Sequence, residues 1–168
     1  LMGNKGKALL MSFVAGSQTA AEREQGFKQG ISQFRDVQLI GTQYSLADAT
    51  RAMSIMDNVL TATPDLAGVF TSEEKTGAGV ARQLEISGKA KDIKFVAFDA
   101  SDALIQALQK GIVDALVVQQ PYQMGYLGVE FAVKAIRGES IPAFVETPTV
   151  VVTRDNFNDP DIQKILYP

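Results

Sequence analysis

Residues 66–98, LAGVFTSEEKTGAGVARQLEISGKAKDIKFVAF, contain a complete strand–helix–strand unit. Two apolar runs, Leu66–Thr71 and Ile93–Phe98, are rich in the β-branched and aromatic residues that favour strands. Between them, Glu74–Ser87 carries apolar residues at helical spacing, and Gly88 follows where a helix end favours glycine. The stretch therefore predicts two parallel strands joined by a crossover helix.

The same unit repeats on both sides of this stretch. Three more apolar runs predict strands at Ala8–Val14, Val37–Tyr44 and Asp114–Gln119. Helical spacing predicts four more helices, at Ala20–Arg35, Asp48–Ala62, Ser101–Lys110 and Tyr122–Arg137. Nearly continuous apolar runs indicate strands that are covered on both faces. With right-handed crossovers, the pattern predicts an α/β fold with a doubly wound parallel sheet in the strand order 2-1-3-4-5.

The helix Tyr122–Arg137 differs from the others because it is apolar around most of its circumference. Its strongly polar residues form one narrow stripe, made of Gln123, Glu130, Lys134 and Arg137. A five-stranded lobe can cover only one side of such a helix, so we expect another part of the protein to cover the rest of its apolar surface. An extended stretch at Phe144–Thr153 and a short helix at Asp159–Leu166 follow it.

Composition excludes several classes of function. The 168 residues are 46% hydrophobic and 21% charged, and the net charge is −3 with lysine and arginine scattered singly. Nucleic-acid binding needs grouped positive charge, so it is not expected. The sequence has no cysteine and no histidine, which removes disulfides, thiol nucleophiles, zinc-type sites and imidazole chemistry. We expect no metal and no cofactor, and we expect any secretion signal to lie outside this sequence.

Polar residues follow each predicted strand, where open parallel sheets bind their ligands. They are Ser17, Asp48 after Ala47, the pair Glu73–Glu74, Asp99 and Gln119. Loops at this position are polar in any such fold, so a purely structural role remains open for each residue.

Arg23 adds a more specific indication. It continues the apolar stripe of its helix, formed by Phe27, Ile31 and Phe34, so its stem is expected to lie along the sheet. Its guanidinium would then reach the strand-end edge, where a planar fork of donors suits vicinal hydroxyls or a carboxylate. The alternative is internal pairing with Asp99 or a glutamate.

The carboxylates Glu73, Glu74 and Asp99 do not by themselves indicate an enzyme. Two carboxylates can support glycoside hydrolysis, yet nothing in the sequence favours this over accepting hydrogen bonds from ligand hydroxyls. The pair Gly77 and Gly79 lacks the third glycine of a dinucleotide-binding loop and follows an acidic turn. We therefore expect no catalytic residues.

Four segments in order resemble the C-terminal lobe of ribose- and galactose-type periplasmic sugar-binding proteins, which serve ABC transporters. They are SQTAAEREQGF at residues 17–27, DLAGVF at 65–70, FVAFD at 95–99 and VVQQPYQMGYLG at 117–128. The resemblance covers essentially the whole chain. It implies a lobe of a two-lobed protein that binds a small polar ligand, such as a monosaccharide, and delivers it to a membrane permease.

The resemblance also suggests site residues. Arg23, Asp99 and Gln119 match ligand-contacting positions of the ribose-binding group, and Glu73 is expected beside them; Ser17, Ala47, Asp48 and Glu74 are secondary candidates. Two departures stand out, because Glu73–Glu74 replaces an Asn–Asp pair and Leu46–Ala47 replaces a stacking aromatic. They point away from ribose or glucose and leave open a ligand with extra donors or a cationic group.

The resemblance divides the chain into three parts. Residues 1–119 are expected to form the ligand-binding lobe, 120–147 to cross the hinge and add a helix to an N-terminal lobe outside this sequence, and 148–168 to return as a C-terminal tail. A periplasmic location, or an extracytoplasmic one with a lipoprotein anchor, is implied.

Three other interpretations remain open. The same fold forms the effector-binding core of lactose-repressor-type regulators, although the segment at 119–128 resembles the transport branch more closely. The chain can also be an assembly module or an enzyme. In isolation it is expected to form a homodimer through helix 122–137.

Overall fold

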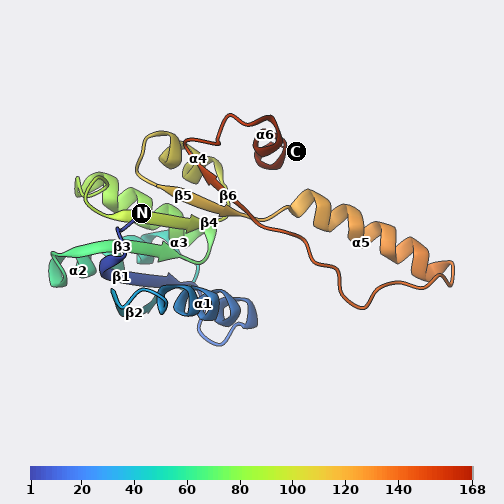
Figure 1. Cartoon of the computed structure of the whole chain (residues 1–168), viewed down its shortest axis with the longest axis horizontal. Coiled ribbons are helices and arrows are strands. Elements are labelled where there is room, and N and C mark those ends of the chain that lie inside the picture. Colours follow the sequence, from blue (N-terminus) through green and yellow to red (C-terminus); the bar gives the residue numbers. More distant parts are fainter. Residues whose placement is uncertain (168) are drawn as a thin grey trace.

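The computed structural model describes residues 1–167, which form a sheet-centred lobe with one long projecting helix (Figure 1). The strands are β1 (Lys5–Ser12), β2 (Asp36–Tyr44), β3 (Leu66–Thr71), β4 (Lys94–Phe98), β5 (Ala115–Val118) and β6 (Val150–Thr153). The helices are α1 (Gln18–Ile31), α2 (Ala49–Ala62), α3 (Glu74–Ile86), α4 (Asp102–Gln109), α5 (Pro121–Ile136) and α6 (Pro160–Leu166).

The sheet has the strand order β2-β1-β3-β4-β5-β6. The pairs from β2 to β5 are all parallel, so the predicted order 2-1-3-4-5 is confirmed. The sixth strand is a difference: β6 adds to the edge antiparallel to β5, with Ala115 opposite Thr153. The sequence predicted an extended segment at Phe144–Thr153, but only its last four residues pair with the sheet.

Strand β1 and helix α1 have other bounds than the sequence predicted. Strand β1 ends at Ser12, so Phe13 and Val14 belong to the loop that leads into α1. Helix α1 ends at Ile31, four residues before the predicted end, and the Ser32 N–H closes its last turn by donating to the Lys28 carbonyl oxygen. The earlier end of β1 leaves Phe13 in the loop at the strand-end edge of the sheet, beside Arg23.

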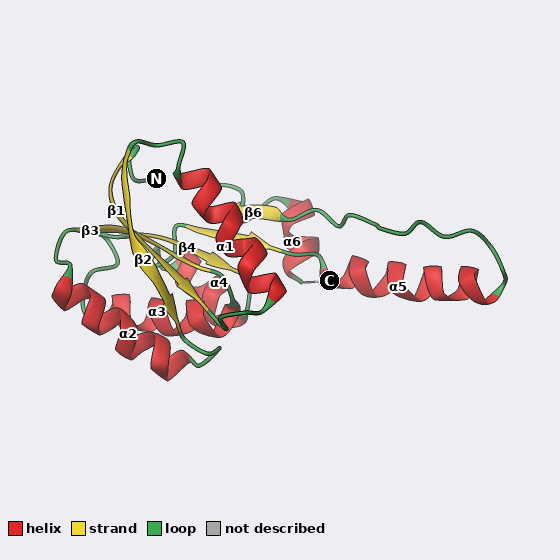
Figure 2. Cartoon of the chain, turned by 90° about the horizontal axis from the view of Figure 1, so that it is seen from below, coloured by secondary structure: helices red, strands yellow, loops and turns green. Residues whose placement is uncertain are grey.

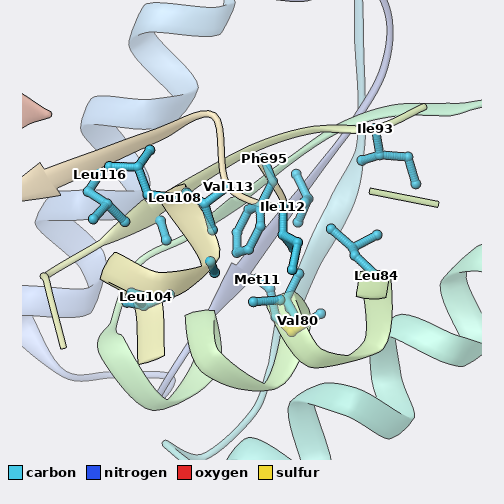
Figure 3. Packing of buried hydrophobic residues seen from close by; sticks show 14 of the residues in the cluster. Met11, Val80, Leu84, Ile93, Phe95, Leu104, Leu108, Ile112, Val113 and Leu116 are labelled. Atoms are coloured by element: carbon cyan, nitrogen blue, oxygen red, sulfur yellow. The ribbon is translucent and has the colours of Figure 1, made fainter. Parts of the chain in front are cut away.

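Helices cover both faces of the sheet, as predicted for a doubly wound fold (Figure 2). Helix α1 lies on one face, where Phe27 stacks on Phe70 of β3 with ring centroids 5.0 Å apart. Helices α2, α3 and α4 lie on the other face and enclose the main core, centred on the fully buried Phe95 of β4 (Figure 3). This core fixes the strands whose ends carry the candidate site.

The pair Gly77 and Gly79 has a packing role. A Cβ at Gly77 would meet Thr71 Oγ1 at 3.0 Å and the Cβ of Ala97 at 3.3 Å, so α3 lies directly on the sheet here. A Cβ at Gly79 would overlap the carbonyl oxygen of Ala49 at the start of α2. The glycines therefore permit the close approach of α3 to both neighbours.

Helix α5 extends away from the lobe and contains no buried residue (Figures 1 and 2). Its exposed apolar residues include Tyr122, Tyr126, Val129, Val133 and Ile136. The chain returns beside it in an extended segment and re-enters the sheet as β6. Among the helices described in residues 1–167, none has the length and apolar character needed to cross a membrane.

Candidate functional site

The carboxyl ends of β1, β2 and β3 and the first turn of α3 are joined by buried hydroxyl groups. The Ser72 hydroxyl donates to Ser12 Oγ at 3.1 Å, and Ser45 Oγ lies 2.6 Å from Thr76 Oγ1. All four residues are fully buried, and each hydroxyl has a partner. The network ties together the loops that present the candidate site residues, which stiffens this edge of the sheet.

Arg23 reaches the edge that its sequence position predicted. Its Nη1 donates to the Ser72 carbonyl oxygen at 2.8 Å, and its guanidinium carbon lies 3.8 Å from the centroid of the Phe98 ring. Phe13 lies on a second side at 5.9 Å. Burial lowers the pKa of Arg23, and the charges of Asp99 and Glu73 oppose this effect. The side chain is therefore held in one orientation by stacking and a backbone hydrogen bond.

Asp99 and Gln119 form a hydrogen-bonded pair at the ends of β4 and β5. Gln119 Nε2 donates to Asp99 Oδ1 at 2.7 Å, and the Asp99 N–H donates to the Val117 carbonyl oxygen at 2.9 Å. Asp99 has φ = 71°, a left-handed conformation that is uncommon for a residue other than glycine. Such strain collects at functional sites, and here it turns the carboxylate at the strand end.

Glu73 has a local structural role at the start of α3. Its Oε1 accepts from the Lys75 N–H at 2.9 Å, and its Oε2 accepts from the Thr76 N–H at 3.0 Å and the Thr76 hydroxyl at 2.9 Å. The carboxylate thus caps three donors of its own helix. The neighbouring Glu74 is exposed and lines a cleft described below.

The secondary candidates occupy loop positions at the same edge. Asp48 caps α2 by accepting from the Arg51 N–H at 2.6 Å, and Ser17 occupies the N-cap position of α1 without a side-chain capping bond. Leu46 and Ala47 adopt left-handed conformations, with φ of 58° and 55°. The Asp48 carboxylate is therefore already hydrogen-bonded to its own helix, and Ala47 has polar groups only in its backbone.

A cleft of about 380 Å³ adjoins the Asp99–Gln119 pair. Its lining comes from the ends of β4 and β5 and from α3, α5 and α6, and comprises Glu74, Asp99, Ala100, Ser101, Val118, Gln119, Pro121, Met124, Ile165 and Leu166. Helix α6 lies beside the start of α5 in both overall views (Figures 1 and 2).

The sequence did not identify four residues that contribute to this edge. Phe13 and Phe98 stack on Arg23, but both looked like ordinary strand residues. Ile165 and Leu166 follow Gln119 by more than forty residues, and no pattern connected them with it. Strand β6 runs antiparallel to β5, with Thr153 opposite Ala115, so the chain must turn back through α6 before Ile165 and Leu166 reach the end of β5.

Within residues 1–167, no group of three or more histidine, cysteine, aspartate or glutamate side chains is arranged to hold a metal ion. The arrangement at the strand ends instead supplies hydrogen-bond donors from Arg23 and Gln119 and acceptors from Asp99. Together they can bind a ligand that carries several hydroxyl groups.

A doubly wound lobe with polar groups at its strand ends, and with one helix extended away from it, is the architecture that the sequence predicted for one lobe of a solute-binding protein. The chain belongs to the family of periplasmic binding protein domains, which matches residues 1–140. The predicted family is thereby confirmed.

Curated relatives and solved structures agree with this assignment. The ribose import binding protein of Salmonella typhimurium is 33% identical over 141 residues, which cover 84% of this chain and 47% of that protein. The D-apiose import binding protein of Actinobacillus succinogenes is 28% identical over 138 residues, 82% of this chain and 44% of that protein. The chain thus spans about half the length of the curated relatives it matches.

Two ABC transporter solute binding proteins from Agrobacterium vitis match almost the whole chain. One was solved with α-D-tagatopyranose and the other with D-fucose; each is 34% identical with a TM-score of 0.94. They cover 99% of this chain, which corresponds to 56% and 57% of the respective structures. This chain is therefore similar to one part of sugar-binding proteins of ABC transporters.

Proposed function

We propose that this chain is the C-terminal lobe of a monosaccharide-binding component of an ABC import system. The observation that carries the proposal is the cluster of Arg23, Asp99 and Gln119 at the strand-end edge. Support comes from the two relatives solved with tagatopyranose and fucose, which match this fold at 34% identity.

In the proposed site, each polar side chain has a separate role. The Arg23 guanidinium, held against Phe98, donates to adjacent sugar oxygens, and Asp99 accepts from a hydroxyl through the oxygen that Gln119 does not occupy. Gln119 keeps its carbonyl oxygen as a further acceptor. Glu73 contributes mainly by fixing the α3 N-terminus, since its oxygens accept from Lys75 and Thr76.

The division of the chain into three parts belongs to the same proposal. Residues 1–119 form the ligand-binding lobe, residues 120–147 cross a hinge and add α5 to a second lobe, and residues 148–168 return. The absence of any buried residue in α5 supports a separate packing surface for this helix. A ligand enclosed between two lobes would be shielded from water on closure.

Transport is favoured over gene regulation and over catalysis. The matched relatives carry the names of import binding proteins, which favours the solute-binding function over a lactose-repressor-type effector core. These relatives bind substrates rather than convert them, so binding without chemistry is the proposed activity. A permease partner and a periplasmic location belong to the same proposal, with support from the family match, and a lipid anchor is a further expectation.

Self-association of the 168-residue chain is a further part of the proposal. Without a second lobe, the apolar residues of α5 stay in water, including Val129 at 67% exposed and Ile136 at 85% exposed. Pairing of two copies through α5 would remove this area from solvent at about 25 cal/mol per Å².

Calorimetric titration of the two-lobed protein with a panel of aldopentoses, aldohexoses, ketohexoses and 6-deoxyhexoses tests the proposed function. We expect saturable one-to-one binding of at least one monosaccharide. The same titration of an Asp99→Asn variant should lose most of the affinity, because a charged acceptor is replaced by an amide. If no monosaccharide in the panel binds, the proposed function is wrong.

A further inference from the structure

The cleft beside Asp99 and Gln119 has two chemically different sides. Its polar side comes from residues that follow β3, β4 and β5, namely Glu74, Asp99, Ser101 and Gln119. Its other side comes from the start of α5 and the end of α6, and consists of Pro121, Met124, Ile165 and Leu166. A ligand in this cleft therefore meets hydrogen-bonding groups on one side and hydrocarbon on the other.

The apolar side is built into the fold and is not a loose tail. Helix α6 begins with a cap in which Asp159 accepts from the Asp161 N–H at 2.9 Å. Ile162 on the same helix is buried in the core, and Gln163 Nε2 donates to the Phe157 carbonyl oxygen at 2.6 Å. Ile165 and Leu166 pack partly against the same core, so their outer surfaces are fixed beside the cleft.

We infer that this site takes a monosaccharide with an apolar end, such as the methyl group of a 6-deoxyhexose, and that Ile165 and Leu166 select that end. The inference rests on the proposed function above. Hydroxyls on the ring bind to Asp99 and Gln119, and the methyl group lies against α6. A hydroxymethyl group in that place would lose its water and find no hydrogen-bonding partner on the α6 side.

A pair of sugars that differ in one oxygen tests this inference directly. D-Fucose is D-galactose without the 6-hydroxyl, so the two present the same ring hydroxyls. Titration of the two-lobed protein with both should show binding of D-fucose about tenfold or more tighter. Equal affinities, or tighter binding of D-galactose, would overturn the inference while leaving monosaccharide binding intact. Binding of neither sugar, when another monosaccharide binds, would also overturn it.

Variants of α6 separate selection by the side chain from a general structural effect. Leu166→Asn gives the 6-hydroxyl a hydrogen-bonding partner, so the preference for D-fucose should fall several-fold, chiefly through tighter binding of D-galactose. Lys164→Ala is the matched control, because Lys164 lies on the same helix with its exposed side chain paired to Asp161, and it should keep the preference. Leu166→Ala shortens the apolar side chain without adding a polar group. It should weaken the binding of D-fucose more than the binding of D-galactose. An unchanged ratio in both Leu166 variants would overturn the role of α6.

Discussion

At the scale of single residues, the site depends on side chains whose orientation is fixed before any ligand arrives. Arg23 is stacked on Phe98 and bonded to the Ser72 carbonyl oxygen, and Asp99 is turned by its left-handed backbone. A preorganised group loses less conformational entropy on binding, so we expect these contacts to raise the affinity for the proposed sugar without touching it.

Arg23→Lys tests the value of that orientation. Lysine keeps the positive charge but loses the planar face that stacks on Phe98 and the fork of donors. We expect the sugar affinity of the two-lobed protein to fall about tenfold, which is about 1.4 kcal/mol. Calorimetry measures the effect, and Arg35→Lys at an exposed turn is the control that should leave affinity unchanged. Unchanged affinity in Arg23→Lys would show that charge alone is sufficient.

Glu73→Ala separates a helix cap from a ligand contact. Removing the carboxylate leaves the Lys75 and Thr76 N–H groups and the Thr76 hydroxyl without this partner, so the free energy of unfolding should fall by about 1 kcal/mol. Denaturant unfolding measures the change. The adjacent Glu74→Ala, which removes an exposed side chain, should alter stability by less than about 0.5 kcal/mol. Equal losses in the two variants would contradict the capping role of Glu73.

The site residues themselves were predictable from the sequence only in part. Arg23, Asp99 and Gln119 were found because strand ends and helix faces follow from hydrophobic periodicity, and the structure brings all three to one edge. Their contact with a ligand stays a prediction. The capping geometry of Glu73 and the stacking of Phe98 were not predictable, because they depend on distances between loops that periodicity does not encode.

At the scale of elements, periodicity predicted the strands and helices well, but not the edge of the sheet. The five parallel strands follow from repeated βα units, whereas β6 is a four-residue segment whose pairing with β5 is non-local. After β6 the chain turns back, so the end of α6 lies at the cleft. That turn is closed by Asn156, whose side chain accepts from the Thr153 N–H at 2.7 Å.

Gly79→Ala tests the contact between α2 and α3. The added methyl group would overlap the Ala49 carbonyl oxygen, so α3 must shift, and the free energy of unfolding should fall by about 1–3 kcal/mol. Gly26→Ala is the matched control on α1, where a Cβ meets open space. Because alanine favours a helix over glycine, this control should raise stability by about 0.5–1 kcal/mol. A stabilising Gly79→Ala would refute the close packing of the two helices.

At the scale of the whole molecule, the lobe and α5 have different packing. The lobe surrounds a continuous core, while α5 has its apolar residues in water and is joined to the lobe through the segments at both of its ends. An element with this character requires a partner surface, which in the proposed protein is the second lobe and in the isolated chain is another copy.

Sedimentation of the isolated 168-residue chain at micromolar concentration tests whether α5 pairs with a second copy of the chain. We expect a dimer, because pairing through α5 removes its apolar residues from water. The double variant Tyr126→Glu and Val129→Glu should sediment as a monomer, since it places charges on the pairing surface. Lys164→Glu on α6, away from that surface, should remain dimeric. A monomeric wild-type chain would contradict pairing through α5.

The proposal that the sugar binds between two lobes is tested most directly by measuring how tightly two forms of the protein bind the same sugar. In the proposed protein the sugar lies between this lobe and a second one, so the isolated chain supplies contacts from one side only and leaves water on the other. Calorimetric titration with the preferred monosaccharide should show binding to the two-lobed protein, with affinity at least about 100-fold weaker for the 168-residue chain. Equal affinities for the two forms would contradict a site shared between lobes.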